Sequence, residues 1–239
     1  MEINYPIRIN KYLASKNYST RIGADLLIKK GQVYINDRKA VLGDKVWEND
    51  KVEVDQKIKL NKYVYFIYNK PIGISTNKDN DAKHILGLTK FISEGSTQRE
   101  KVFPIGRLDK DSHGLIILTN DGRITDRLLS PKYIHEKEYI VKTEKPFTDR
   151  FLENMQNGVA IGGYKTKKCK ARRKNKNTFH IILTEGKKHQ IRRMCEALHH
   201  KVTDLQRIRI MNLELGDIKK GEYQELDGKQ LKEFLKLLT

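Results

Sequence analysis

Asp109 is the residue of this sequence whose type and setting most directly suggest chemistry. It lies between the glycines at positions 106 and 114, just before the apolar run LIIL at 115–118. An aspartate has an ordinary pKa of about 3.9, so at neutral pH it is an ionised base or nucleophile that needs no activating partner. A turn that leads into a buried strand also explains residues 104–122, so this stretch alone does not establish a site.

Tyr139 is a second candidate, in the segment KEYIVKT at 137–143. The alternation predicts a strand, and if Ile140 faces the core, Tyr139 and Val141 share the opposite face. A tyrosine that packs on a sheet with its hydroxyl at the edge explains the same pattern. Tyr139 therefore gains weight only from its combination with other candidates.

Arg192 and Arg193 are the third candidates, because they follow Gly186 near the start of a predicted helix. Four apolar residues of that helix have the i, i+3, i+4, i+7 spacing of a core stripe: Ile191, Met194, Cys195 and Leu198. The two arginines lie off the centre of this stripe. Positive charge near a helix start opposes the macrodipole unless an anion or a carboxylate lies nearby, so we expect such a partner.

The composition favours a polyanionic partner. The chain has 239 residues, which is enough for one large domain or two unequal ones, and we expect two. Lys and Arg number 48 against 30 for Asp and Glu, which gives a net charge of +18 and a sequence pI near 9.7. Such an excess attracts nucleic acid above all.

Membrane, disulfide and metal roles are not expected. No apolar run reaches the roughly 18 residues that span a bilayer, and the N-terminus MEINYPIRINKYL is too charged for a signal peptide, so we expect a cytoplasmic protein. Cys169 and Cys195 are predicted to be reduced thiols. Cys195 lies near His189, His199 and His200 in the sequence, but the spacing is not that of a zinc site, so no metal is expected.

Residues 6–54 have the pattern of a compact unit with two helices followed by short strands. Ile9, Tyr12 and Leu13 have helical spacing, and Ser19-Thr20 can cap a second helix that Gly31 ends. After Gly31 the apolar period becomes two, which predicts strands. Cations are expected on the exposed faces of this unit: Arg8, Lys11, Arg21, Lys29, Lys30, Arg38 and Lys39.

A lysine-rich segment at 55–62 is the predicted linker, so the predicted domains are residues 1–60 and 61–239. We expect residues 77–101 to form an exposed loop, and 165–176, with eight cations and no acid, to form a solvated hairpin that adds to the polyanion-binding surface. The other predicted elements are strands at 64–70, 114–119, 137–143 and 178–184, and helices near 123–130, 148–157, 189–199 and 228–238. Without a strict alternation of strand and helix, this order predicts an α+β fold with a largely antiparallel sheet.

Four motifs occur in order along the second predicted domain. They are N-K-P-x-G at Asn69–Gly73, G-R-L-D-x-x-[ST]-x-G-L at Gly106–Leu115, K-x-Y-x-V at Lys137–Val141, and E-G-x-x-H-Q-I-R-R-M at Glu185–Met194. With these motifs the chain resembles the bacterial ribosomal RNA pseudouridine synthases of the RsuA/RluB/RluF kind, and it looks most like the RluF branch. One departure is His113, where relatives often carry Ser, Thr or Gln, and it affects no catalytic residue.

The resemblance implies a fold and a substrate. The first unit is similar to the S4 RNA-binding domain in Arg8, Lys11–Ala14 and Ser19–Arg21, and the second implies the pseudouridine synthase fold. The implied function is the isomerisation of uridine to pseudouridine in ribosomal RNA, with 23S rRNA favoured over 16S rRNA and a tRNA as a further candidate. The reaction needs no cofactor, and we expect a monomer.

The resemblance also implies roles for residues. Asp109 starts the cleavage of the glycosidic bond, and Arg192, with Arg193 as the alternative, is the cation that pairs with Asp109 when the site is covered. Tyr139 stacks on the uracil, and whether it also takes the C5 proton is left open. Arg107 occupies the space that the flipped base leaves. The expected RNA contacts are Arg107, Arg193 and Lys70 in the second domain and Arg8, Lys11, Arg21, Lys29 and Lys30 in the first.

Two other functions fit part of the sequence. A non-catalytic RNA-binding or ribosome-assembly factor explains the charge and the first sixty residues, but not the acid, tyrosine and arginine in these motifs. A glycosidase explains Asp109 together with Asp111, since residues two apart in an extended segment point the same way at roughly 6–7 Å. Its signature would be the release of free uracil.

We expect binding to folded rRNA to weaken steeply with salt, because phosphate contacts release counterions when they form. Between about 50 mM and about 200 mM monovalent salt, the affinity should fall by at least about 100-fold. Filter binding over this range measures the slope. An affinity that changes less than about threefold would contradict a role for the basic surface in binding.

Overall fold

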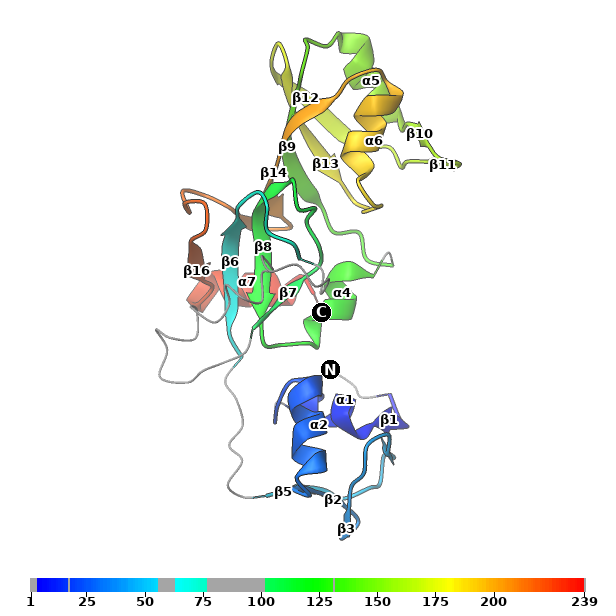
Figure 1. Cartoon of the computed structure of the whole chain (residues 1–239), viewed down its shortest axis with the longest axis vertical. Helices are drawn as coiled ribbons and strands as arrows, with labels where there is room; N and C mark the ends of the chain where they lie inside the picture. Colours follow the sequence, from blue (N-terminus) through cyan, green and yellow to red (C-terminus); the bar gives the residue numbers. More distant parts are fainter. Residues whose placement is uncertain (1–3, 17, 56–62, 77–101, 131, 239) are drawn as a thin grey trace.

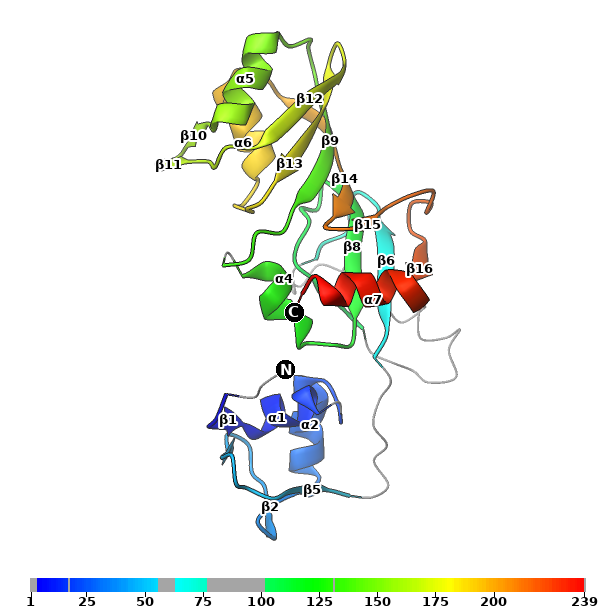
Figure 2. The same cartoon turned by 180° about the vertical axis from the view of Figure 1, so that it is seen from behind.

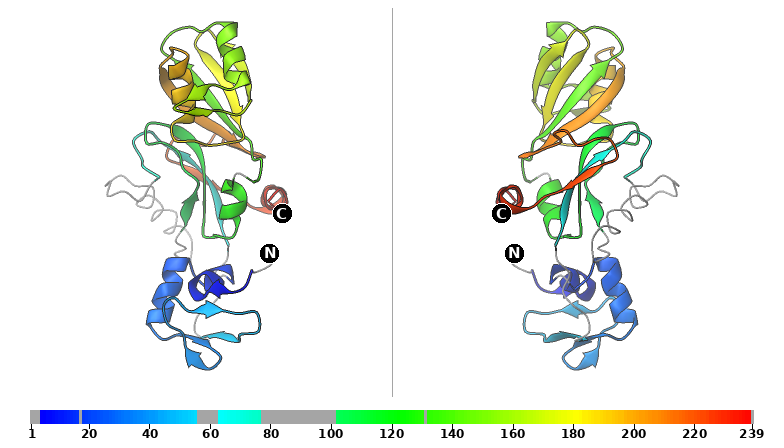
Figure 3. Two further views of the ribbon diagram at one scale, coloured as in Figure 1. Left: turned by 90° about the vertical axis from the view of Figure 1, so that its right-hand side faces the viewer. Right: turned by 90° about the vertical axis from the view of Figure 1, so that its left-hand side faces the viewer.

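A computed structural model of the chain describes residues 4–16, 18–55, 63–76, 102–130 and 132–238. The molecule is elongated, and Figure 1 shows a small N-terminal unit at one end and a long sheet that extends to the other. Figure 3 shows the same order along the long axis. The predicted loop at 77–101, nearly all of the predicted linker, and the predicted domain boundary between residues 60 and 61 lie outside the described residues, so the boundary stays a prediction.

The N-terminal unit has its own core. The second helix begins as expected, because the Thr20 hydroxyl accepts a hydrogen bond from the Gly23 backbone N–H at 3.1 Å. The core face of this helix is Ala24 and Ile28, whereas Ile22 is 62% exposed. The elements are β1 (Ile7–Arg8), α1 (Ile9–Ser15), α2 (Arg21–Lys29), β2 (Val33–Ile35), β3 (Arg38–Lys39), β4 (Lys45–Val46) and β5 (Val52–Val54).

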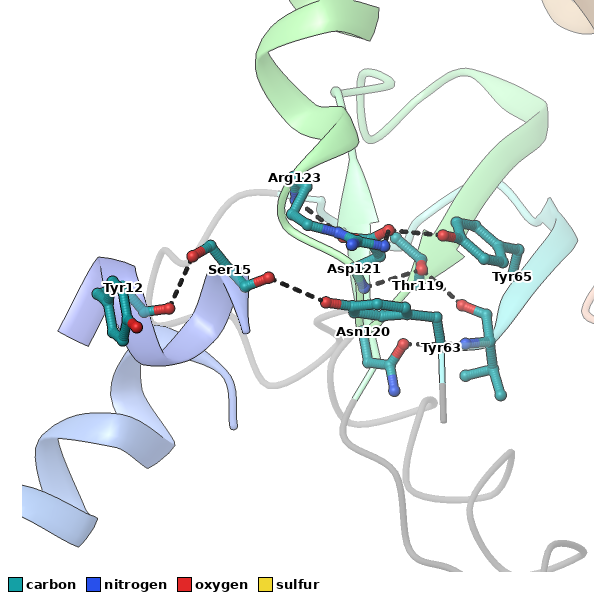
Figure 4. Close-up of polar contacts among 9 residues, drawn as sticks. Tyr12, Ser15, Tyr63, Tyr65, Thr119, Asn120, Asp121 and Arg123 are labelled. Carbon is teal, nitrogen blue, oxygen red and sulfur yellow. Dashed lines mark hydrogen bonds and ion pairs between the residues drawn. The ribbon is translucent and has the colours of Figure 1, made fainter. Parts of the chain in front are cut away.

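Tyr63, just before the large sheet begins, contacts both parts of the molecule (Figure 4). Its hydroxyl donates a long hydrogen bond of 3.5 Å to the Ser15 carbonyl oxygen at the end of α1. Its ring lies under the Arg123 guanidinium, 3.8 Å from the ring centroid. Arg123 is fixed by two 2.8 Å hydrogen bonds to the buried Asp121 carboxylate, which also accepts one from the Tyr65 hydroxyl at 2.6 Å. The start of the sheet is thereby tied to α1.

The remaining strands form one nine-stranded sheet in the order β12-β13-β9-β14-β8-β6-β16, with β15 paired to β14 and β7 paired to β8. Among the described strands of this sheet, all pairs are antiparallel except β14 with β8. The prediction of an α+β fold with a mostly antiparallel sheet is confirmed. The strands are β6 (Tyr65–Lys70), β7 (Phe103–Ile105), β8 (His113–Thr119), β9 (Lys137–Thr143), β12 (Lys170–Asn175), β13 (Thr178–Leu183), β14 (Val202–Ile210), β15 (Leu213–Glu214) and β16 (Tyr223–Glu225).

Helices cover the two halves of this sheet separately. Figure 2 shows α5 and α6 together on the β12-β13-β9-β14 half, and α4 and α7 beside the half that contains β6 and β8. The predicted stripe on α6 is confirmed, because Met194 and Cys195 are fully buried and Ile191 is 4% exposed. The helices are α4 (Ile124–Leu129), α5 (Asp149–Asn157), α6 (Gln190–Ala197) and α7 (Gly228–Lys236), and a small hairpin, β10 (Ala160–Ile161) with β11 (Tyr164–Lys165), lies beside α6. In the ranges that the structure describes, no helix has the length and apolar character that a membrane crossing requires.

The core face of β9 is the one that carries Val141 and Tyr139. Val141 is fully buried in the cluster beneath α5 and α6, and Tyr139 packs against the same cluster. The alternative in which Ile140 faces this core is therefore wrong. The alternation of side chains is as predicted, but its buried face is the opposite one.

The central strand β14 is not predicted by the sequence pattern. Its pairing with β9 shifts register between Val202 and Asp204 and again between Arg207 and Arg209. The buried positions therefore fall at 202, 205, 207 and 210, one of which is an arginine. Bulges of this kind remove the period of two from which strands are recognised.

Gly114 is required where β8 meets β14. Its φ is +105°, and a Cβ atom there would lie 2.2 Å from the Arg207 carbonyl oxygen. We expect Gly114→Ala to lower the free energy of unfolding by about 3 kcal/mol or more, because strain and a backbone clash combine. Urea unfolding measures the loss.

The matched control for this change is Gly216→Ala. Gly216 has a φ of +55°, but a Cβ atom added to it would meet no other atom within 4 Å. Only the backbone strain of about 1–2 kcal/mol therefore applies at this position. Equal losses in the two variants would contradict the close approach of β14 to Gly114.

Candidate active site

The loop that carries Asp109 lies between β7 and β8 and is held by its backbone. The Thr76 hydroxyl accepts a hydrogen bond from the Leu108 N–H at 3.2 Å and donates one to the Leu108 carbonyl oxygen at 3.0 Å. The Gly73 N–H donates to the carbonyl oxygen of Lys110 at 2.7 Å. These contacts fix the residues on both sides of Asp109 against the turn that follows β6.

His189 is the titratable side chain that the structure places against the Asp109 carboxylate. Its Nε2 lies 3.4 Å from the Asp109 carboxylate, whose side chain is 31% exposed. His189 precedes α6 in a left-handed conformation, with φ 52° and ψ 31°. Such a backbone is costly for a residue other than glycine, and residues held in it cluster at functional sites. From the sequence, His189 is a candidate only for metal binding, although it belongs to the fourth motif.

Arg192 reaches the same loop but binds the neighbouring acid. Its Nη2 donates to the Asp111 carbonyl oxygen at 2.9 Å and to the Ser112 hydroxyl at 3.2 Å, and its Nε lies 3.5 Å from the Asp111 carboxylate. The predicted pairing of Arg192 with Asp109 is thus not seen. The physical reason is that α6 begins at Gln190, so His189 comes nearest to Asp109, and Arg192 lies almost one turn further along.

Arg193, the predicted alternative, points to another part of the molecule. Its Nη2 lies 2.4 Å from the place that a Cβ atom of Gly162 would occupy, in the turn between β10 and β11. The two arginines therefore diverge from α6, one to the Asp109 loop and one to the β10–β11 hairpin. Only Arg192 remains a candidate for the site.

Tyr139 lies in a row of paired residues that crosses the sheet. Lys70 on β6 pairs with Gly114 on β8, Gly114 pairs with Arg207 on β14, and Arg207 pairs with Tyr139 on β9. Directly paired residues project from the same face of a sheet. The side chains of Lys70, Arg207 and Tyr139 therefore share one face, and Arg207 reaches the Asp109 loop from it through the Arg107 carbonyl oxygen.

Lys70 does not lie on an RNA-facing surface, as its motif predicted, but inside the fold. The side chain is fully buried, and its ammonium donates to the carbonyl oxygens of Pro71 at 2.9 Å and Ile74 at 3.0 Å. Burial, with the charge of Arg207, lowers the pKa of Lys70 to about 8, and the nearby Asp111 and Asp109 partly oppose this shift. Burial thus makes Lys70 an internal cation of the site. The other expected RNA contacts at Arg107, Arg8, Lys11, Arg21, Lys29 and Lys30 are all exposed.

Glu185 and Gln190 belong to the fourth motif, and their role is visible only in the structure. Glu185 accepts hydrogen bonds from the Tyr164 hydroxyl at 2.5 Å, the Lys167 N–H at 3.0 Å and the Gln190 amide at 2.8 Å. Gln190 in turn accepts one from the Lys187 N–H at 2.9 Å. These bonds shape the turn that presents His189, and the only signal for them in the sequence is their place in the fourth motif.

The chemistry of the site is that of a carboxylate among cations. Within the described ranges, no three or more His, Cys, Asp and Glu side chains group so as to hold a metal ion. Burial raises the pKa of Cys195 to about 12 and that of Cys169 to about 11, so both thiols are protonated at neutral pH. Asp109 is the half-exposed acid from which a reaction with an electrophilic carbon could start.

Comparisons with known proteins agree with the motifs. Residues 64–197, more than half of the chain, match the family described as RNA pseudouridylate synthase. The dual-specificity RNA pseudouridine synthase RluF of Salmonella typhi is 41% identical over 236 residues, which cover 97% of this chain and 79% of that protein. The ribosomal large subunit pseudouridine synthase B of Bacillus subtilis is 35% identical over 234 residues, 94% of each chain. A crystal structure of a pseudouridylate synthase, 28% identical, has a TM-score of 0.69 and covers 98% of this chain and 100% of its own.

Replacing Lys70 with Met should remove a pH dependence of stability. The pKa falls from an ordinary value of 10.5 to about 8 in the folded chain, so between these pH values the unfolded state binds more protons. The free energy of unfolding of the wild type should therefore rise with pH relative to Lys70→Met over this window. Urea unfolding of both proteins from about pH 7 to about pH 10 measures the difference.

Lys137 has a similarly lowered pKa, but it does not affect the difference in stability between the two proteins. Burial, with the charge of Arg207, lowers its pKa to about 8 as well, and it is present in both proteins, so its contribution cancels. A stability difference that stays constant across the window would contradict the buried, depressed ammonium at Lys70.

Proposed function

Because the chain belongs to the RNA pseudouridine synthases of the RsuA/RluB/RluF kind, and is therefore an isomerase of uridine in RNA, we propose that its substrate is ribosomal RNA of the large subunit and that Asp109 begins the reaction. The observation that carries the proposal is the position of Asp109, a half-exposed carboxylate in a loop held at its backbone and bordered by His189 and Arg192. The proposed location is the cytoplasm. The proposed active unit is a monomer, because one chain supplies all of these residues.

The choice of substrate is supported by charge and by the relatives. The net charge of +18 and the exposed cations favour a large, folded polyanion over a small one. One relative carries the large ribosomal subunit in its name, and this favours 23S over 16S rRNA. A tRNA is a second candidate, in line with the dual specificity in the name of the RluF relative.

The N-terminal unit is proposed to bind structured RNA as an S4 domain does. The cations predicted for its surface are exposed on α1 and α2, next to the ends of these helices and on β3, and a separate core supports these elements. Contacts from such a surface to phosphates fix position but carry little sequence information. The selection of one uridine would then depend on the fold of the RNA around the active site.

The proposed reaction breaks the C1′–N1 bond of uridine, turns the uracil, and joins C1′ to C5. The proton on C5 leaves, N1 gains a proton, and no electrons are exchanged with a cofactor. Asp109 supplies the carboxylate that starts the cleavage. Tyr139, on the face of the sheet shared with Arg207, is proposed to stack on the uracil, and acceptance of the C5 proton is a separate second role for its hydroxyl.

The target base is proposed to leave its stack before the reaction. Extrusion of a base costs a few kcal/mol, which phosphate contacts elsewhere on the surface can offset. Arg107, exposed beside Asp109, is proposed to occupy the space that the base leaves. When the base covers Asp109, the internal cation Lys70 and the neighbouring Arg192 would compensate for the loss of water around the carboxylate.

The test is to map pseudouridine after incubation with unmodified 23S rRNA, 16S rRNA and tRNA. The wild type should modify 23S rRNA, and Asp109→Asn should lower the rate by at least about 1,000-fold because the variant lacks the carboxylate. Asp111→Asn is the matched control in the same loop. Its side chain is 63% exposed, and its ion pair with the Arg192 Nε is long, at 3.5 Å. Exposed ion pairs contribute little energy, so we expect a rate within about fivefold of wild type.

Three results would contradict the proposal. Full activity of Asp109→Asn would remove Asp109 from the mechanism. Release of free uracil, with equal losses in both variants, would favour a glycosidase that uses paired acids. Tight binding of rRNA without any pseudouridine would favour a non-catalytic RNA-binding factor.

A further inference from the structure

Arg207 is a buried cation beneath the loop that carries Asp109. The whole residue is 3% exposed and lies in the middle of β14. Its backbone is paired with Gly114 on one side and Tyr139 on the other. Arg207 therefore occupies the point where the half of the sheet that supports Asp109 joins the half that supports Tyr139.

The guanidinium of Arg207 binds both ends of the Asp109 loop. Its Nε donates to the Leu115 carbonyl oxygen at 2.7 Å, and its Nη1 donates to the Arg107 carbonyl oxygen at 3.2 Å. Leu115 lies just inside β8, after the loop, and Arg107 stands two residues before Asp109. One planar group with fixed donor directions thus sets the distance between the entry and the exit of the loop.

Stability alone does not account for an arginine at this position. Within the described residues no carboxylate forms an ion pair with Arg207, and its buried Nη2 has no hydrogen-bond partner. A buried cation without a carboxylate partner is costly, and apolar side chains of similar volume often serve a fold better. The charge of Arg207 also contributes to the low pKa values of Lys70 and Lys137. Arg207 therefore lowers the stability of the fold at the place where the reaction is proposed to occur.

We propose that Arg207 is a positioning residue, which sets the loop geometry that presents Asp109 and Arg107 to the flipped nucleotide. It acts through two backbone carbonyl groups and does not need to touch the substrate. This inference rests on the proposed function of Asp109. It extends that function by assigning the support of the catalytic loop to β14, outside the four sequence motifs.

The test compares Arg207→Lys with Arg209→Lys. A lysine at position 207 keeps the charge but cannot reach both carbonyl oxygens. We expect the single-turnover rate of pseudouridine formation to fall roughly 10- to 100-fold, as for a small misplacement of a catalytic group, while the Kd for the same RNA changes less than about threefold. Hydrogen exchange of the amides in residues 107–115 should become faster in this variant, since the loop loses at least one of its two hydrogen bonds to residue 207.

Arg209 is the matched control because it lies on the same strand and faces the other side of the sheet. Its guanidinium binds Glu138 at 3.0 Å and Glu136 at 2.9 Å, away from the Asp109 loop. Arg209→Lys should lose stability without a change in the single-turnover rate or in the exchange of residues 107–115. If Arg207→Lys does not fold, Arg207→Gln, which keeps one donor group, takes its place with the same expected results.

Two outcomes would overturn the inference. One is a folded position-207 variant with the wild-type single-turnover rate and unchanged exchange of the loop. The other is a loss confined to the Kd, which would make Arg207 an RNA-binding residue. Neither outcome touches the proposed function itself, because the comparison of wild type with Asp109→Asn decides that function independently.

Discussion

The close parallel contact between β14 and β8 is the constraint on which the arrangement of the site depends. The backbone of Arg207 lies so near Gly114 that a Cβ atom on the glycine would be 2.2 Å from the Arg207 carbonyl oxygen. Among the described strands this is the one parallel pair in the nine-stranded sheet, and it joins the half covered by α5 and α6 to the half that carries β6 and β7. Asp109 belongs to one half, and Tyr139, His189 and Arg192 belong to the other. The site exists because these halves are held in a fixed register.

The charges around the site are arranged with the acids outermost. The Asp109 and Asp111 side chains are 31% and 63% exposed, whereas Lys70 and Arg207 are buried below the loop. Interactions between charges strengthen as water is removed, so cations below a half-exposed carboxylate have their largest effect when a nucleotide covers it. The pKa of about 8 at Lys70 shows that the fold keeps such a cation at a cost. Burial therefore costs free energy at Lys70 and at the same time strengthens the interaction of its charge with the Asp109 carboxylate.

Regular elements of the fold could be predicted because their patterns are local. The strand at 137–143 has the predicted bounds, and α6 has the predicted core stripe. β14 could not be predicted, because two bulges and the buried Arg207 remove the period of two from its sequence. Lys70 was misplaced for a related reason, since a lysine in a motif gives no sign of whether its ammonium finds carbonyl oxygens inside the fold.

The sequence by itself determined the family, the basic surface and the residues from which a site could be built, because four motifs in order and a net charge of +18 are properties of the chain alone. Only the tertiary structure decided which of these residues meet. His189 lies next to Asp109, Arg192 binds Asp111, and Arg207 supports the loop from a strand outside the motifs. Such pairings depend on strand register and on the residue at which a helix begins, and a shift of one residue in either changes every contact.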